Sequence, residues 1–394
     1  MYSTTSILAQ AYYELYNYTK AESIYTELAA ETSDPKKRKE IQNKIAISIY
    51  QQAESSKTSN NIQAANAHYA RISDVVPQSD IAPTALYNAV ALATANKLWQ
   101  DAIAYITKFQ RMYPDNQYSQ DVTKKLSIAY LNSNQDIEAA RQFEKISQFD
   151  QNSEVRMAAL WQAAELYETK KDYTSAIRSY TEYANTFKTP YSQNMESMHK
   201  ISTLYTASGN HKMASKWNET IAKTDSSTSK SEKNDRTKFI TSTANLNLAK
   251  DSQAEYERYK LVEPLNQNLK LKKSAMLKSV NYYGQASQYG ILEMVTQSTY
   301  SIAQIYSDFS KALLTSERPK KLNAEELEQY QILLEDQAFP FEEKAIEFYE
   351  TNISRVKEGI YTDWIKQSHS RLKELFPARY NREAKMDAYI NVYQ

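Results

Sequence analysis

The feature that most constrains this chain of 394 residues is a pattern of side chains that recurs at a nearly fixed interval. Its most regular members are five alanines at spacings of 37, 37, 37 and 38 residues, namely Ala65, Ala102, Ala139, Ala176 and Ala214. Bulky side chains follow most of these alanines after four and seven residues. Recurrence at this period is typical of a solenoid, in which stacked units share one continuous core.

The unit at residues 160–190 shows what is repeated. Its first half carries apolar residues at helical spacing, Leu160, Ala163, Ala164 and Tyr167, and its second half carries Ala176, Tyr180 and Tyr183. A polar turn separates the halves, and Pro190 ends the second because proline has no N–H to donate. Each unit is therefore predicted to be a hairpin of two amphipathic helices that cannot bury its apolar faces alone.

Composition restricts the class further. Only 4 glycines are present, and no alternating strand pattern stands out, so we predict an all-α fold. The 48 basic and 47 acidic residues give a net charge of +1, which offers no case for nucleic-acid binding. No apolar run is long enough to span a membrane, and the lack of cysteine excludes disulfides and thiolate metal sites.

The order of small residue, turn, alanine, aromatic residue and proline resembles the tetratricopeptide repeat (TPR) family. The best copies are Leu86, Trp99, Ala102 and Pro114, and Leu160, Tyr173 and Ala176. The family repeat has about 34 residues, so each hairpin here is longer, and the family glycine is replaced by Val90, Ala164 and Ser202. The resemblance implies a TPR-like αα-hairpin solenoid, a right-handed superhelix with a concave groove that binds proteins or peptides.

Changes in pattern along the chain predict four regions. Residues 1–223 should form about six TPR-like hairpins, and residues 224–263 a polar loop followed by a degenerate hairpin. Residues 264–376 should form a lobe of longer helices, with separate helices at 324–336 and 340–358, and residues 377–394 a tail. The repeat pattern already begins at Leu8 and Ala9, and the first residues contain no signal-like segment. Any membrane anchor is therefore expected to lie outside this sequence.

Two C-terminal segments, residues 298–319 and 334–352, are similar to part of a group of bacterial cell-envelope TPR proteins encoded beside Tol/Exb-type motor proteins. This resemblance implies a periplasmic protein, associated with the outer membrane, that works with such a motor or with an envelope assembly complex. The absence of cysteine is compatible with an oxidising compartment.

One column of side chains is the candidate partner-binding site. Tyr87, Lys124, Trp161 and His199 hold one position on successive first helices, and Glu165 follows Trp161 by one turn. In the TPR family these positions line the groove, and aromatic and cationic side chains are effective anchors for a partner. Alternatively, Trp161 packs between adjacent hairpins as a core residue. Because Ile128 follows Lys124 by one turn, the site does not fit the family's clamp for carboxylate tails.

Motifs for catalysis are not found in the sequence. The 4 glycines are isolated, no two histidines share metal-ligand spacing on a helix, and no nucleophile elbow is present. We therefore predict a non-catalytic interaction scaffold without catalytic residues, cofactor or metal. The alternative is a helical enzyme or accessory protein that acts on peptidoglycan.

Overall fold

The computed structural model describes residues 2–320 and 322–381, and every regular element within these ranges is a helix. The predicted all-α fold is therefore confirmed. The chain divides into two compact units, residues 1–183 and 184–394, which are described separately below. No helix in the described ranges combines the length and apolar character needed to cross a bilayer.

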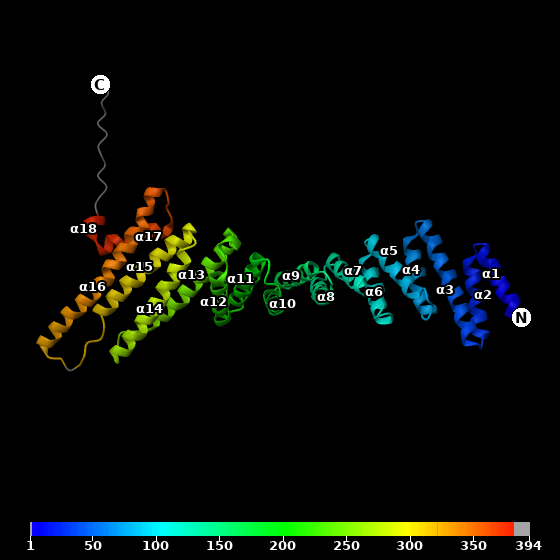
Figure 1. Ribbon diagram of the computed structural model, residues 1–394, viewed down its shortest axis with the longest axis horizontal. Coiled ribbons are helices and arrows are strands. Elements are labelled where there is room, and N and C mark those ends of the chain that lie inside the picture. The colour runs from blue at the N-terminus through cyan, green and yellow to red at the C-terminus, as the bar shows by residue number, and fades with distance from the viewer. Residues whose placement is uncertain (1, 321, 382–394) are drawn as a thin grey trace, which may run out of the picture. The chain divides into compact units, whose positions relative to one another are not determined.

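The first unit consists of five helical hairpins. Its helices are α1 (Tyr2–Glu14), α2 (Tyr18–Glu31), α3 (Pro35–Thr58), α4 (Ile62–Val75), α5 (Ala82–Ala95), α6 (Trp99–Met112), α7 (Ser119–Asn132), α8 (Asp136–Phe149), α9 (Ser153–Thr169) and α10 (Tyr173–Thr186). From α1 to α9, each helix packs against the next one (Figure 1). The second hairpin is longer than a regular one because α3 has 24 residues, ten more than the 14 residues of α4.

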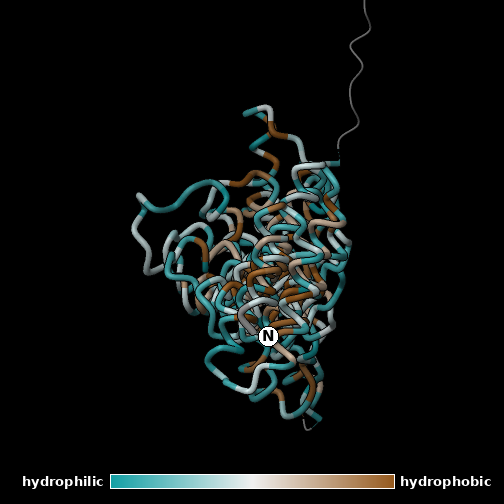
Figure 2. Tube along the Cα trace, turned by 90° about the vertical axis from the view of Figure 1, so that its right-hand side faces the viewer, coloured by the Kyte–Doolittle hydropathy of each residue, from teal (hydrophilic) through white to brown (hydrophobic). Residues whose placement is uncertain are grey.

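The recurring alanines are buried where helices meet. Ala65, Ala102, Ala139 and Ala176 are fully buried, and Ala214 is 5% exposed. Ala102 of α6 forms a cluster with Ala93 of α5 and Ala129 of α7, so three helices meet around small side chains. Teal and brown segments alternate along the trace, as expected for helices with one buried and one exposed side (Figure 2).

The hairpin turns explain why the period is so constant. One residue in each turn has a left-handed backbone, at Tyr16, Asn60, Lys97, Asn134, Lys171 and Gly209. The residue that follows donates its N–H to a carbonyl five residues back, as Leu98 does to Ala93 at 2.9 Å and Asp172 to Tyr167 at 2.9 Å. This is the Schellman arrangement that ends a helix. A fixed turn of this kind starts each second helix at the same place in the repeat.

The second unit begins with one further hairpin and continues with longer helices. Its elements are α11 (Tyr191–Ala207), α12 (His211–Ser227), η1 (Lys230–Glu232), α13 (Asp235–Arg258), α14 (Leu265–Ser287), α15 (Leu292–Leu314), α16 (Ala324–Ser354), η2 (Arg355–Glu358), α17 (Asp363–Leu375) and α18 (Pro377–Tyr380). Helices α14, α15 and α16 contain 23, 23 and 31 residues. The predicted region boundaries at residues 223, 263 and 376 stay a prediction, and residues 382–394 of the tail lie outside the described part.

The degenerate hairpin predicted near residues 237–261 is wrong, because this segment is the single helix α13. The helix starts with a capping box, in which the Asn234 side chain accepts from the Thr237 N–H and the Thr237 side chain accepts from the Asn234 N–H. No glycine or proline interrupts the segment afterwards, and buried residues recur from Ile240 to Tyr256. Apolar spacing alone could not distinguish one long helix from two short ones.

The break predicted at Pro340 is also wrong, because α16 continues through it. Pro340 is exposed, so water can reach the carbonyl that loses its partner at the proline. The buried stripe of the helix continues past it from Ala338 to Ala345 and Tyr349. Packing against α15 therefore stabilises the helix on both sides of the proline.

Two glycines provide a matched test of the turn geometry. Gly209 has φ +78° and Gly284 lies inside α14, and a Cβ at either position would meet nothing within 4 Å. We expect Gly209→Ala to lower the free energy of unfolding by about 1 kcal/mol, because alanine disfavours the left-handed backbone. Gly284→Ala should raise it by about 0.5–1 kcal/mol, because alanine favours the helix. Urea unfolding followed by circular dichroism measures both; equal midpoints for the two variants would contradict the assignment.

Candidate protein-binding surface

Three residues of the predicted column lie in the first unit, on the first helices of successive hairpins. Tyr87 is on α5, Lys124 on α7 and Trp161 on α9, and all three side chains are half-buried. Their recurrence at a spacing of 37 residues thus corresponds to equivalent places in three neighbouring hairpins. The structure also assigns each of them contacts within the chain.

Tyr87 is held by the hairpin that follows it. Its ring stacks on that of Tyr118 with centroids 4.2 Å apart and planes inclined by 10°. Its hydroxyl donates to Oδ2 of Asp121 at 2.7 Å. This hydrogen bond, together with burial, raises the pKa of Tyr87 to about 12. The hydroxyl and the ring of Tyr87 are therefore both engaged within the chain.

Lys124 forms an ion pair with the aspartate that ends α8. Its Nζ lies 2.5 Å from Oδ2 of Asp150, whose side chain is only 7% exposed. The lysine ammonium and the backbone N–H of Asn152 hold the pKa of Asp150 below its ordinary value. The charge of Lys124 is consequently matched inside the chain, which makes this part of the surface less basic than the sequence suggests.

Trp161 contacts the second helix of its own hairpin. Its indole meets the rings of Tyr180 and Tyr183 edge-on, at centroid distances of 5.3 and 5.1 Å. Both tyrosines are buried, whereas Trp161 is half-buried and keeps an accessible part. Glu165 lies one turn further along α9 and is also half-buried. An indole beside a carboxylate can receive an apolar or cationic side chain of a partner.

His199 lies on α11 in the second unit, so its membership of the column stays a prediction. Burial lowers the pKa of this imidazole below its ordinary value of 6.5, although Glu196 acts in the opposite direction. The side chain is therefore neutral at pH 7, and it differs in this respect from the cationic anchor at Lys124. In the described ranges, no three His, Asp or Glu side chains are grouped so that they could hold a metal ion.

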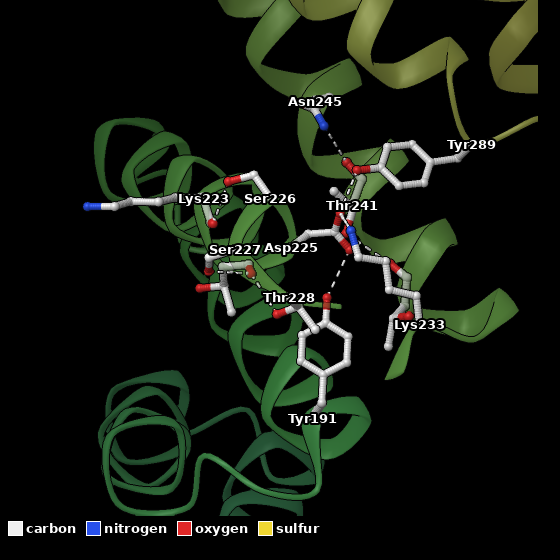
Figure 3. A network of polar contacts seen from close by, with 12 residues as sticks. Tyr191, Lys223, Asp225, Ser226, Ser227, Thr228, Lys233, Thr241, Asn245 and Tyr289 are labelled. Carbon is white, nitrogen blue, oxygen red and sulfur yellow. Dashed lines mark hydrogen bonds and ion pairs between the residues drawn. The ribbon is translucent and has the colours of Figure 1, made fainter. Parts of the chain in front are cut away.

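The sequence did not reveal a buried carboxylate of the second unit that joins several segments. Asp225 on α12 is 1% exposed and accepts three hydrogen bonds (Figure 3). The donors are the hydroxyl of Tyr191 at 2.9 Å, the hydroxyl of Tyr289 at 2.7 Å and the ammonium of Lys233 at 2.7 Å. This Asp225 cluster joins α11, α12, the linker before α13 and the turn before α15.

The Asp225 cluster has the electrostatics of a structural clamp. Burial alone would raise the pKa of Asp225, but the Lys233 ammonium and the two tyrosine hydroxyls outweigh it and hold the pKa below 3.8. Burial and the same carboxylate raise the pKa of both Tyr191 and Tyr289. Asp225 is thus kept ionised and the two tyrosines are kept protonated at neutral pH. Acid–base catalysis requires the opposite, a group whose pKa lies near the working pH.

Removing the charge at Asp225 tests this assignment. We expect Asp225→Asn to lower the free energy of unfolding at pH 7 by about 3 kcal/mol, because Lys233 would be left without its buried partner. Since the folded-state pKa is depressed, the stabilisation is present above about pH 4 and is lost as the pH falls further. Urea unfolding at several pH values measures this effect. The difference in the free energy of unfolding between Asp225→Asn and the unsubstituted chain should become smaller at acidic pH.

The matched control for this experiment is Asp235→Asn, which removes an exposed carboxylate nearby. Its effect should stay below about 1 kcal/mol at every pH, as is usual for surface ion pairs. A deficit of Asp225→Asn that does not change between neutral and acidic pH would contradict the proposed role of the carboxylate charge.

Comparison with known proteins gives likeness in fold alone. No protein-family model matches the sequence, and no curated protein matches it. Similar solved structures include PilF of Pseudomonas aeruginosa, with 15% identity over 58% of this chain and 93% of that chain and a TM-score of 0.24. A tetratricopeptide repeat protein of Parabacteroides merdae has 13% identity over 69% and 98% of the two chains, with a TM-score of 0.24.

The TPR domain of P58(IPK) is a third similar structure, with 14% identity over 97% of this chain and 99% of that chain and a TM-score of 0.25. At these values the fold assignment rests on the hairpins themselves. Their paired helices, buried alanines and repeated turns form a TPR-like solenoid.

Proposed function

We propose that this chain is a non-catalytic scaffold that binds a protein or peptide along the first helices of its hairpins. The observation that carries the proposal is the half-buried position of Trp161, which is fixed by two buried tyrosines and still accessible. A rigid aromatic side chain of this kind loses little conformational entropy on binding and can supply a binding hot spot. Glu165 beside it favours a partner segment with a cationic residue.

The compartment and partner are proposed from sequence likeness. We propose a periplasmic, outer-membrane-associated location and an assembly with Tol/Exb-type motor proteins, on the resemblance implied by the sequence of residues 298–319 and 334–352. The near-neutral chain, with its net charge of +1, suits a protein partner better than a polyanion. The partner in this proposal is a segment of an envelope protein.

The experiment is affinity capture from envelope extracts, followed by mass spectrometry and by titration of the captured partner. Trp161→Ala should weaken its binding by about 1–3 kcal/mol, which is about 5- to 150-fold in Kd. The melting temperature should change little, because an accessible indole contributes less to folding than a buried one. A buried tryptophan would instead cost about 3–5 kcal/mol of stability.

The control is Tyr361→Ala, which removes an aromatic side chain that is 70% exposed and lies outside the column. Binding should be unaffected by this change. Unchanged binding by Trp161→Ala together with a collapsed melting temperature would show that the tryptophan is a core residue. Capture of cytosolic proteins alone would contradict the envelope assignment.

A further inference from the structure

The first half of α16 has an unusual charge and exposure for a chain that is neutral as a whole. Residues 324–339 contain five acidic side chains and no basic one, while the whole chain carries +1. Four large apolar side chains in the same segment are exposed by 42–59%, namely Leu327, Ile332, Leu333 and Phe339. We call residues 324–339 the acidic arm. Acidic and apolar groups together on an exposed helix indicate a docking surface.

The acidic arm is exposed because its neighbour in the hairpin ends first. Helices α15 and α16 are antiparallel, and their register is set by ring contacts of Phe309 with Phe341 at 4.7 Å and of Tyr300 with Tyr349 at 5.7 Å. In this register the end of α15 at Leu314 lies beside residue 336. The preceding residues of α16 therefore extend beyond α15 by about 18 Å (Figure 1).

A surface of opposite charge lies on α14. This helix has four lysines and no acidic residue. Lys272 is buried and donates to the carbonyls of Tyr256 and Tyr259, at 3.1 and 3.0 Å. The others are exposed beside two exposed leucines, and together they form what we call the basic face, Lys270, Lys273, Lys278, Leu271 and Leu277.

Both surfaces adjoin the same end of α15. The segment after α15 is joined to the segment before α14, because the Glu317 N–H donates to the Leu261 carbonyl at 2.9 Å. The Glu263 N–H in turn donates to Oε2 of Glu317 at 2.8 Å. The basic face lies mostly on the first half of α14, and the acidic arm lies on the first half of α16. Each of these halves comes after the junction in the sequence.

We propose that the chain forms a two-fold dimer in which the acidic arm of each copy lies on the basic face of the other. Both surfaces combine charge with apolar side chains, so each satisfies the charge of the other while it covers exposed leucine, isoleucine and phenylalanine. A two-fold axis makes this contact twice and closes the assembly. A second copy thus covers both surfaces at once. A different protein that is complementary to the arm alone would leave the basic face uncovered.

The first measurement is sedimentation velocity of the full chain over a roughly hundredfold concentration range. We expect a monomer–dimer equilibrium in about 0.1 M NaCl that shifts strongly towards monomer in about 1 M NaCl, where the Debye length falls from about 10 to about 3 Å. A chain that is monomeric at every concentration overturns the proposal. This holds also if the arm binds a different protein instead.

Charge reversal makes the test specific. The arm variant carries Glu328→Lys, Glu335→Lys and Asp336→Lys, and the face variant carries Lys270→Glu, Lys273→Glu and Lys278→Glu. Each variant alone should be monomeric, because its arm and face have like charges. Mixed in equal amounts they should form dimers again, since both contacts between unlike variants are then attractive.

Two controls accompany the reversals. Circular dichroism establishes that each variant is folded, and the restored dimer of the mixture can form only from folded chains. A third variant reverses three exposed charges in the first unit, Glu27→Lys, Glu31→Lys and Glu40→Lys, and should dimerise like the unsubstituted chain. Dimers in either single variant, or a mixture that stays monomeric, would overturn the proposed pairing.

Discussion

The whole array depends on the close approach of helices around a buried alanine in each hairpin. At Ala102 three helices of the first unit meet around the methyl groups of Ala93, Ala102 and Ala129. Larger side chains flank this point and complete the core, as Ile106 and Phe109 do in the same helix. Because neighbouring hairpins share these residues, no hairpin has a complete core of its own.

Polar contacts between neighbouring hairpins add to this apolar core. Ion pairs between residues 34 apart join neighbouring hairpins, as with Lys108 and Asp74 at 2.7 Å. They lie near the surface, where each contributes about 0–1 kcal/mol. The Asp225 cluster differs because its carboxylate is buried, and it orders four segments around one charge. The long helices of the second unit are therefore tied to its hairpin by hydrogen bonds as well as by packing.

The repeat was predictable from sequence because its signal is local and recurs: an alanine, then bulky residues after four and seven positions. The column at Tyr87, Lys124 and Trp161 was found by the same periodicity, but not the intramolecular contacts that each side chain makes. Pro340 was misinterpreted as a break because the packing of α16 on α15 is not encoded near the proline. Asp225 escaped notice because Tyr289, which donates to it, is 64 residues away.

The most direct test of shared stability is native-state hydrogen exchange of the chain and of Ala102→Leu. The larger leucine side chain would crowd the contact with Ala93 and Ala129, at a cost of about 1–3 kcal/mol. If neighbouring hairpins share one core, amide protection should fall in α5, α6 and α7 and remain unchanged in α14, α15 and α16. Loss of protection confined to the α5–α6 hairpin, or an equal loss throughout the chain, would contradict a core that each hairpin shares with its neighbours.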